Sequence, residues 1–402
     1  MTFHFRRADR LRDVTISASA AMTDKATELK AQGLKVISLS SGEPDFPTAP
    51  HVVEAAHAAM LGGDTKYPPQ TGKPALLKAI QAKFKRDNGL DYALDEILTG
   101  NGGKQLIFDA LMAGCNAGDE VLVPAPGWIT YADIVHLAGA VPVRVDCPER
   151  LGFRLDPGAL EAAITPRTRW LILNFPNNPT GAMCSREDLR EIADIVLRHP
   201  DLWVLTDDIY EHLIYSGEFL TIAQIEPRLR DRTITINGLS KAYAMTGWRV
   251  GYAGGPREAI AAMNAIQLQA TGGICTAAQA AAVAALEGPQ DYLAERAAIY
   301  KDRRDMVLSM LAEIDGLTCA VPEGAFYVFP NISALLGKTT PAGTTLKTDT
   351  DFVLALLAEA QVTTVQGSAY GMSPYFRISY AAKTEELREA CQRIVDFCKS
   401  LV

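Results

Sequence analysis

Features of exported, membrane-spanning and metal-dependent proteins are scarce in this sequence. The amino-terminal segment MTFHFRRADRLRDVT has no apolar run of the kind found in signal peptides. No stretch of about 18 apolar residues, the length needed to span a bilayer, occurs anywhere in the chain. We therefore expect neither export nor a membrane span, and the expected location is the cytoplasm.

The cysteines and histidines are not spaced as redox pairs or metal ligands. The chain has seven cysteines and six histidines, but it contains no CxxC and no HExxH sequence. We expect reduced, mostly buried thiols, and neither a catalytic cysteine nor a catalytic metal. The cysteines are Cys115, Cys147, Cys184, Cys275, Cys319, Cys391 and Cys398.

The composition is that of a globular protein with a large core. Of the 402 residues, 48% are hydrophobic and 21% are charged, so we expect two or more domains. The formal net charge of −8 disfavours nucleic acid as a partner, although a local basic site for an anion is compatible with it.

Short apolar segments alternate with longer segments from Glu120 onward, and the longer ones, such as 185–198, are long enough to form helices. Continuous apolar strands separated by helices predict a mostly parallel sheet that is covered on both faces. The predicted strands span residues 121–123, 141–145, 170–174, 203–206 and 233–236.

The two ends of the chain predict a second, smaller unit. Its expected elements are helices at 23–32 and 385–401 and strands at 324–329 and 376–380. Thr23 or Asp24 would cap the first helix, and Gly33 would end it. We predict three segments: 1–47, which joins the small domain, 48–297, which is the large domain, and 298–402, which is the small carboxyl-terminal domain.

Polar residues follow three of the predicted strands directly, at 174–178, 207–210 and 237–241. Ligands of open α/β sheets bind beyond the carboxyl ends of the strands. The three segments are therefore expected to meet in one crevice and to form a cofactor site.

Lys241 is a candidate nucleophile in the last of these segments, eight positions before Arg249. A lysine must be neutral to attack a carbonyl, and an enclosed site near other cations lowers its pKa. Taken alone, a surface lysine and a structural arginine in a loop explain the segment equally well.

Motifs along nearly the whole chain resemble the class I aminotransferases, and in particular the bacterial aspartate aminotransferases of the Thermus and rhizobial type. They are SGEPDF (41–46), KYPPQTG (66–72), GGKQ (102–105), PNNPTG (176–181), TDDIYE (206–211), GLSK (238–241) with RVG (249–251), GAFY (324–327) and FRIS (376–379). They stand in the order of that family.

This resemblance implies an α/β protein with the type I fold of the pyridoxal-phosphate (PLP) dependent transferases. That fold has a large domain with a mostly parallel seven-stranded sheet between helices, and a smaller α+β domain built from both termini. The resemblance also implies pyridoxal 5'-phosphate as the cofactor and a homodimer with shared active sites.

For the reacting centre, the resemblance implies that Lys241 holds the cofactor as a Schiff base and then moves the substrate proton. Asp207 would pair with the pyridine nitrogen, although an aspartate after a strand commonly caps a helix instead. Tyr210 and Asn178 would hydrogen-bond the cofactor's phenolic oxygen. Trp128 would stack on the ring, although core packing is the usual place of an aromatic residue.

For the cofactor phosphate, the resemblance implies backbone amides of Gly102, Gly103 and Lys104 at the start of a helix, where an anion is favoured. Arg249 would add a charge-assisted pair. Tyr67 would reach the phosphate from the neighbouring subunit.

For the substrate, the resemblance implies that Arg377 clamps the α-carboxylate with help from the Gly42 amide; otherwise Arg377 is a solvated residue at a strand edge. Lys104 would meet a distal carboxylate with help from Ser17 and Ser19, or would contribute only its amide. The expected substrate-binding residues are Gly42, Lys104, Trp128, Asn178 and Arg377.

The chain departs from the family in three places. Gly238 stands where many relatives have a hydroxyl residue, so one phosphate contact is expected to be missing. Gly127 replaces the tyrosine that usually precedes the stacking tryptophan. Ser-Ala-Ser at 17–19 replaces Ser-Ala-Thr, Ile16 replaces a proline, and Thr15 replaces a basic residue seen in prephenate-accepting relatives, which disfavours prephenate as a substrate.

We therefore expect ping-pong transamination, with aspartate as the donor and 2-oxoglutarate as the acceptor. An aromatic or broad-specificity aminotransferase is the alternative. The same fold also hosts PLP β-lyases, decarboxylases and non-catalytic PLP-binding regulators. A nucleotide-binding α/β domain is disfavoured because no GxGxxG or Walker sequence follows the first strand.

Overall fold

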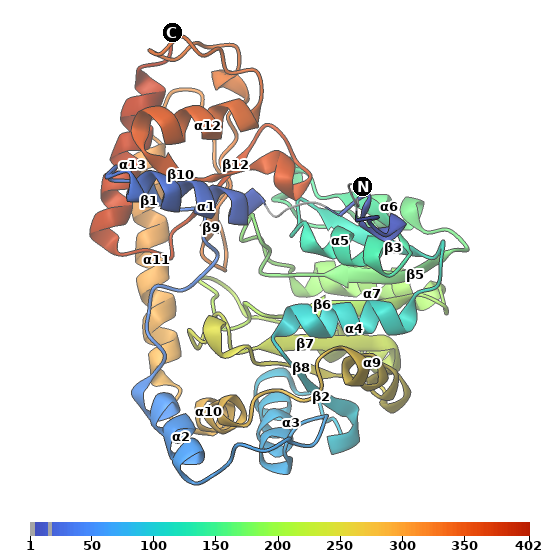
Figure 1. The fold of residues 1–402 in the computed structure, drawn as a ribbon. Coiled ribbons are helices and arrows are strands. Elements are labelled where there is room, and N and C mark those ends of the chain that lie inside the picture. Colours follow the sequence, from blue (N-terminus) through green and yellow to red (C-terminus); the bar gives the residue numbers. More distant parts are fainter. Residues whose placement is uncertain (1–4, 15–17) are drawn as a thin grey trace, which may run out of the picture.

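A computed structural model describes residues 5–14 and 18–402 (Figure 1). Its centre is a seven-stranded sheet in the order β2-β8-β7-β6-β5-β3-β4. Only β8 runs antiparallel to its neighbours, so the predicted mostly parallel sheet is confirmed. The strands are β2 (Ile97–Gly100), β3 (Glu120–Ala125), β4 (Val141–Asp146), β5 (Thr168–Leu173), β6 (Trp203–Asp207), β7 (Thr233–Gly238) and β8 (Gly251–Gly254).

Helices cover both faces of this sheet, which explains why its strands are continuously apolar. Leu171 of β5 pairs with Val204 of β6, and both pack into the core on one face. The next residues, Ile172 and Leu205, pack into the core on the other face. The first core is closed by α6 (Pro157–Ala163), α7 (Arg186–Arg198) and α8 (Ile222–Ile225), and the second by α4 (Gly103–Gly114), α5 (Thr130–Leu137) and α9 (Arg257–Ala270).

The two ends of the chain pack together in a smaller unit, as predicted. β1 (Ile37–Ser38) pairs with β10 (Val362–Thr363), and Figure 1 shows the blue and red segments side by side. A three-stranded antiparallel sheet has the order β11 (Val365–Gln366), β12 (Phe376–Ser379), β9 (Tyr327–Val328). The helices of this unit are α1 (Ala18–Ala31), α11 (Asp291–Leu311), α12 (Asp349–Ala360) and α13 (Thr384–Lys399). Because α11 runs unbroken through residue 297, the exact domain boundary stays a prediction.

Two predicted elements differ in extent from the structure. The first helix begins at Ala18 and not at Thr23, because Ala18, Ala20 and Ala21 have high helix propensity and extend it. The predicted strand at 324–329 is reduced to β9, because Ala325 has a φ of 57°, outside the β region. The helix at 185–198 is confirmed, with Ser185 as its cap.

Three further helices pack below the sheet: α2 (Pro50–Leu61), α3 (Pro74–Asn88) and α10 (Thr276–Glu287) (Figure 1). Within the described residues, no helix is both long enough and apolar enough to cross a membrane.

Candidate active site

A cavity of about 500 Å³ opens beyond the carboxyl ends of the parallel strands. Residues that follow β5, β6 and β7 meet there, as the positions of the polar segments predicted. The predicted site residues that line it are Gly42, Gly103, Lys104, Trp128, Asn178, Asp207, Tyr210, Lys241, Arg249 and Arg377. Ser19 lines it too, whereas Thr15, Ile16 and Ser17 lie outside the described residues.

Lys241 projects into the cavity from the segment after β7. Its Nζ donates a hydrogen bond to the Gly42 carbonyl oxygen at 2.6 Å. Burial, followed by the positive charges of Arg377 and Arg249, lowers the pKa of Lys241 to about 8. More of this amine is therefore neutral near neutral pH than in an ordinary lysine, and a nucleophile or proton carrier requires the neutral form.

Asp207 ends β6 at the floor of the cavity, and no helix begins there, so the helix-cap interpretation is wrong. Tyr131 Oη donates to Asp207 Oδ2 at 2.7 Å, and Asn174 Nδ2 donates to the Asp207 carbonyl oxygen at 2.9 Å. Burial raises the pKa of Asp207 to about 6, while the hydrogen bond from Tyr131 opposes this rise. These contacts fix the orientation of the carboxylate, which can accept a hydrogen bond from a donor in the cavity.

Arg377 lies on β12 and is buried, so it is not a solvated strand-edge residue. Its Nη1 donates to Asn178 Oδ1 at 2.9 Å and its Nη2 to the Ser40 carbonyl oxygen at 2.6 Å. The guanidinium carbon lies 4.4 Å from the ring centroid of Tyr327. Arg377 Nε has no hydrogen-bond partner among the described residues. The guanidinium is therefore fixed in place but can still donate hydrogen bonds to an anion.

Another part of the cavity wall is a cationic helix terminus. α4 begins at Gly103, and Gly102 has a φ of +85°, a conformation that favours glycine. A Cβ at Gly102 would collide with the Arg249 guanidinium, which donates to the Asn101 carbonyl oxygen at 3.1 Å. An arginine beside free helix amides is a site for a phosphate-like anion.

Trp128 and Lys104 form a side wall. The Trp128 ring contacts the Tyr131 ring edge-to-face at 5.3 Å, and Lys104 Nζ lies 4.9 Å from the Trp128 ring centroid. Burial and the nearby Arg249 lower the pKa of Lys104. Tyr210, deeper in the site, shares a hydrogen bond of 2.9 Å with the Tyr327 hydroxyl.

Tyr67 is not brought into the cavity. Its side chain is fully exposed, in the segment between α2 and α3. Its side chain does not line the cavity of this chain.

Local packing explains both glycine departures. A Cβ at Gly238 would lie 2.9 Å from the Val250 carbonyl oxygen, so a serine side chain does not fit there without a backbone shift. A Cβ at Gly127 would collide with the Pro124 carbonyl oxygen. Each glycine is therefore required by the backbone of this chain.

Sequence reasoning assigned no individual role to Tyr131, Tyr327 or Asn174, although it expected the segment that begins at Asn174 to reach the site. All three line the cavity, and each bonds a predicted site residue. Tyr327 and Asn174 lie in or beside segments that the sequence had singled out. Tyr131 gives only a weak signal, its position one helical turn after Trp128.

Comparison with known proteins gives full-length matches. A family model described as aminotransferase class I and II matches residues 35–394. The aspartate aminotransferase of Rhizobium meliloti strain 1021 is 52% identical over 398 residues, which cover 99% of this chain and 97% of that protein. The aspartate/prephenate aminotransferase of Cereibacter sphaeroides is 51% identical over 395 residues, 98% of this chain and 99% of that protein.

Solved structures also match over nearly the whole chain. The crystal structure of the Rhizobium meliloti aspartate aminotransferase superimposes with a TM-score of 0.96 at 52% identity, covering 99% of this chain and 100% of that one. The Thermus thermophilus aspartate aminotransferase with maleate superimposes with a TM-score of 0.92 at 39% identity, covering 98% and 100%.

Proposed function

The chain belongs to the class I and II aminotransferase family, and on that premise we propose that it transfers the amino group of L-aspartate to a 2-oxo acid, 2-oxoglutarate foremost, with pyridoxal 5'-phosphate as cofactor. The observation that carries the proposal is the meeting of Lys241, Asp207 and Arg377 in one cavity. These residues come from the end of β6, from the segment after β7 and from β12, and transamination needs a reactive amine, an acceptor for a ring proton and a carboxylate clamp.

The residues of the cavity fit this cofactor. The helix terminus at Gly103 with Arg249 matches a phosphate, and the buried carboxylate of Asp207 matches a protonated ring nitrogen. Trp128 offers a flat wall for the ring. When bound, pyridoxal phosphate supplies an electron-withdrawing ring that takes up the electron pair of the substrate α-carbon.

Each side chain then has a task of its own. Arg377, fixed by Asn178 and the Ser40 carbonyl, orients the amino acid through its α-carboxylate. Lys241 Nζ takes the α-proton, holds it and returns it, for which a pKa of about 8 is suited. Asp207 holds the proton of the ring nitrogen.

Lys104 supports an acidic donor, because its ammonium lies in the cavity wall without a salt bridge among the described residues. The relatives named as aspartate aminotransferases support the same preference. An aromatic donor is the second candidate, since Trp128 beside Lys104 offers an aromatic side chain a surface to pack on.

The proposed unit is a homodimer. A fully exposed tyrosine is unusual, and Tyr67 contacts no residue of its own cavity, which supports a role in the site of a second copy. The full cavity would then have walls from both subunits.

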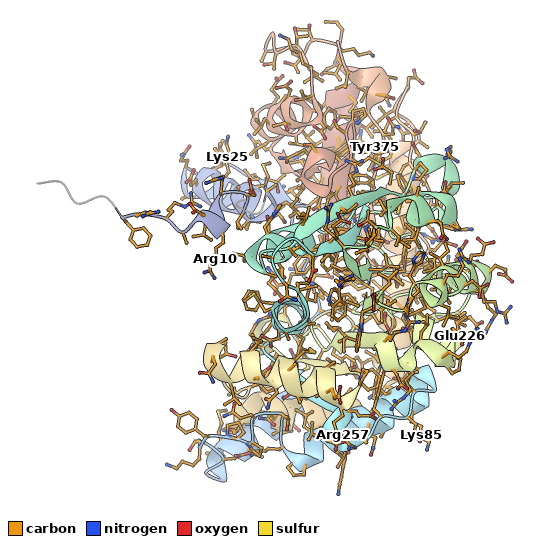
Figure 2. The ribbon with its side chains drawn as sticks, turned by 90° about the vertical axis from the view of Figure 1, so that its right-hand side faces the viewer. Arg10, Lys25, Lys85, Glu226, Arg257 and Tyr375 are labelled. Atoms are coloured by element: carbon orange, nitrogen blue, oxygen red, sulfur yellow. The ribbon has the colours of Figure 1, made fainter. Side chains whose placement is uncertain are left out.

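The test is the visible spectrum of the purified protein before and after L-aspartate or L-phenylalanine. We expect a pyridoxal-phosphate band that aspartate converts to the pyridoxamine form. Lys241→Ala should lose turnover by about 10⁴-fold, whereas the matched control Lys85→Ala, which alters an exposed lysine of α3 (Figure 2), should not. Normal turnover in Lys241→Ala, or no cofactor band in the wild type, contradicts the proposal.

A further inference from the structure

The ionisable lining of the cavity includes one acidic residue that the proposed mechanism leaves unused. The charged residues that line it are Asp24, Lys104, Asp207, Lys241, Arg249 and Arg377. Arg249 serves the phosphate, Asp207 and Lys241 the reacting centre, and Arg377 the α-carboxylate. Two groups of opposite sign, Lys104 and Asp24, remain for the substrate side chain.

Asp24 and Lys104 belong to different elements that face the same space. Asp24 is in α1, next to Lys25, and Figure 2 labels Lys25 on the outside of the molecule. Lys104 is in the first turn of α4. Both residues are in contact with solvent, although the cavity wall covers part of Lys104, and neither forms a salt bridge with any residue in the described part of the chain. The charge of Asp133 acts on Lys104, but no salt bridge holds Lys104 or Asp24 among the described residues, so each can still interact with a ligand in the cavity.

Asp24 has no local structural task in its helix. The sequence predicted it as a helix cap, but α1 begins at Ala18, so Asp24 lies in the helix interior. There aspartate has low helix propensity and caps nothing. Glu28, one turn later, is likewise exposed but does not line the cavity.

We infer that Asp24 is a specificity-determining residue that weakens the binding of dicarboxylic substrates relative to aromatic monocarboxylic ones. A second carboxylate is attracted by Lys104 but repelled by Asp24. An uncharged aromatic side chain is neither attracted by Lys104 nor repelled by Asp24. The inference rests on the proposed function. Asp24 makes this chain less selective for aspartate than it would be with Lys104 but without Asp24.

Unreactive ligands test the inference by binding alone. Maleate carries two carboxylates, and 3-phenylpropionate carries one carboxylate and a ring. The dissociation constants of both are measured by titration calorimetry on the cofactor-loaded wild type and on Asp24→Asn, at low ionic strength where charges are least screened. Glu28→Gln is the matched control, because it removes the same charge from the same helix.

We expect Asp24→Asn to bind maleate about threefold more tightly, a modest gain because both side chains are in contact with water. Binding of 3-phenylpropionate should stay the same, and Glu28→Gln should resemble the wild type for both ligands. An unchanged maleate constant in Asp24→Asn, or an equal gain in Glu28→Gln, overturns the inference.

The same proteins separate this inference from the proposed function. If the wild type produces a 2-oxo acid from aspartate but Asp24→Asn binds maleate no better, only the role of Asp24 is wrong. If the wild type produces no 2-oxo acid from aspartate or phenylalanine, the proposed function fails, and the inference that rests on it falls with it.

Discussion

Tyr131 Oη donates a hydrogen bond to Asp207 Oδ2 across 2.7 Å, and both side chains are buried. Burial raises the pKa of Asp207 to about 6, and this donor stabilises the carboxylate against a further rise. The Tyr131 ring also contacts Trp128 edge-to-face. One residue therefore fixes both the acidic floor and the aromatic wall of the site.

Tyr131→Phe should make the enzyme less active at low pH. Loss of a hydrogen bond to a buried carboxylate raises the pKa of Asp207 by about one unit. Because the reaction needs the carboxylate form, the acidic limb of the kcat/KM profile should move to higher pH by a similar amount. Tyr92→Phe removes another buried hydroxyl, which contacts Thr235 at 3.1 Å, and should leave the limb in place. An unmoved limb in Tyr131→Phe would show that Tyr131 does not tune Asp207.

The central strands were predictable because burial on both faces makes them continuously apolar. All five predicted runs overlap strands of the sheet. β2 and β8 were not predicted. β8 has glycine at both ends, Gly251 and Gly254, and glycine has low strand propensity. Its extended form depends on pairing with β2 and β7 on its two sides, which a local pattern does not contain.

The site was predictable as far as its residues lie in motifs. The contact between Tyr131 and Asp207 joins residues 76 positions apart, and Arg377 reaches the Ser40 carbonyl across 337 positions. Such pairs arise only when the chain has folded. The place of Asp24 was misjudged for a related reason, because the start of α1 at Ala18 changes a cap position into a cavity wall.

Arg377→Leu should retain the cofactor but bind amino acids poorly. Two charge-assisted hydrogen bonds to the α-carboxylate are lost, so KM for the donor should rise by about 100-fold. The cofactor band should persist, since Arg377 is not part of the helix terminus beside Arg249 that matches the phosphate. Arg257→Leu removes an exposed arginine of α9 (Figure 2) and should keep a normal KM. A normal KM in Arg377→Leu would remove this residue from the substrate site.

The reactivity of Lys241 should depend on pH with a midpoint near its pKa of about 8. The neutral amine is the reactive form, so the rate at which the apo-protein takes up pyridoxal phosphate should rise as pH rises through this value. After burial, the positive charge of Arg377 is the main cause of the lowered pKa. Arg377→Leu should therefore shift the midpoint to higher pH, while Arg257→Leu should not. A midpoint that stays in place in Arg377→Leu would show that the two charges are not coupled.

Lys83 and Glu211 form a buried salt bridge behind the site. Glu211 directly follows Tyr210 in the sequence. Lys83 Nζ also donates to Asn88 Oδ1 at 2.8 Å, and Asn88 Nδ2 donates to Glu211 Oε2 at 2.9 Å. Burial acts to raise the pKa of Glu211, but the charges of Lys83 and His212 hold it below its usual value. The ion pair thus ties the segment that carries Asp207 and Tyr210 to α3.

Lys83→Met should destabilise the fold by about 3–5 kcal/mol, because it leaves a buried carboxylate without its partner charge. Without Lys83, Glu211 keeps only Asn88 and His212 as neighbours, so burial raises its pKa, and its destabilising effect grows as pH rises and is smaller at pH 5 than at pH 8. The double variant Lys83→Met with Glu211→Gln removes both charges and should recover much of the loss. Urea unfolding of the wild type and all variants at pH 5 and pH 8 measures these differences in the free energy of unfolding. Equal losses at pH 5 and pH 8, with no recovery in the double variant, would show that Lys83 stabilises through packing and not through its charge.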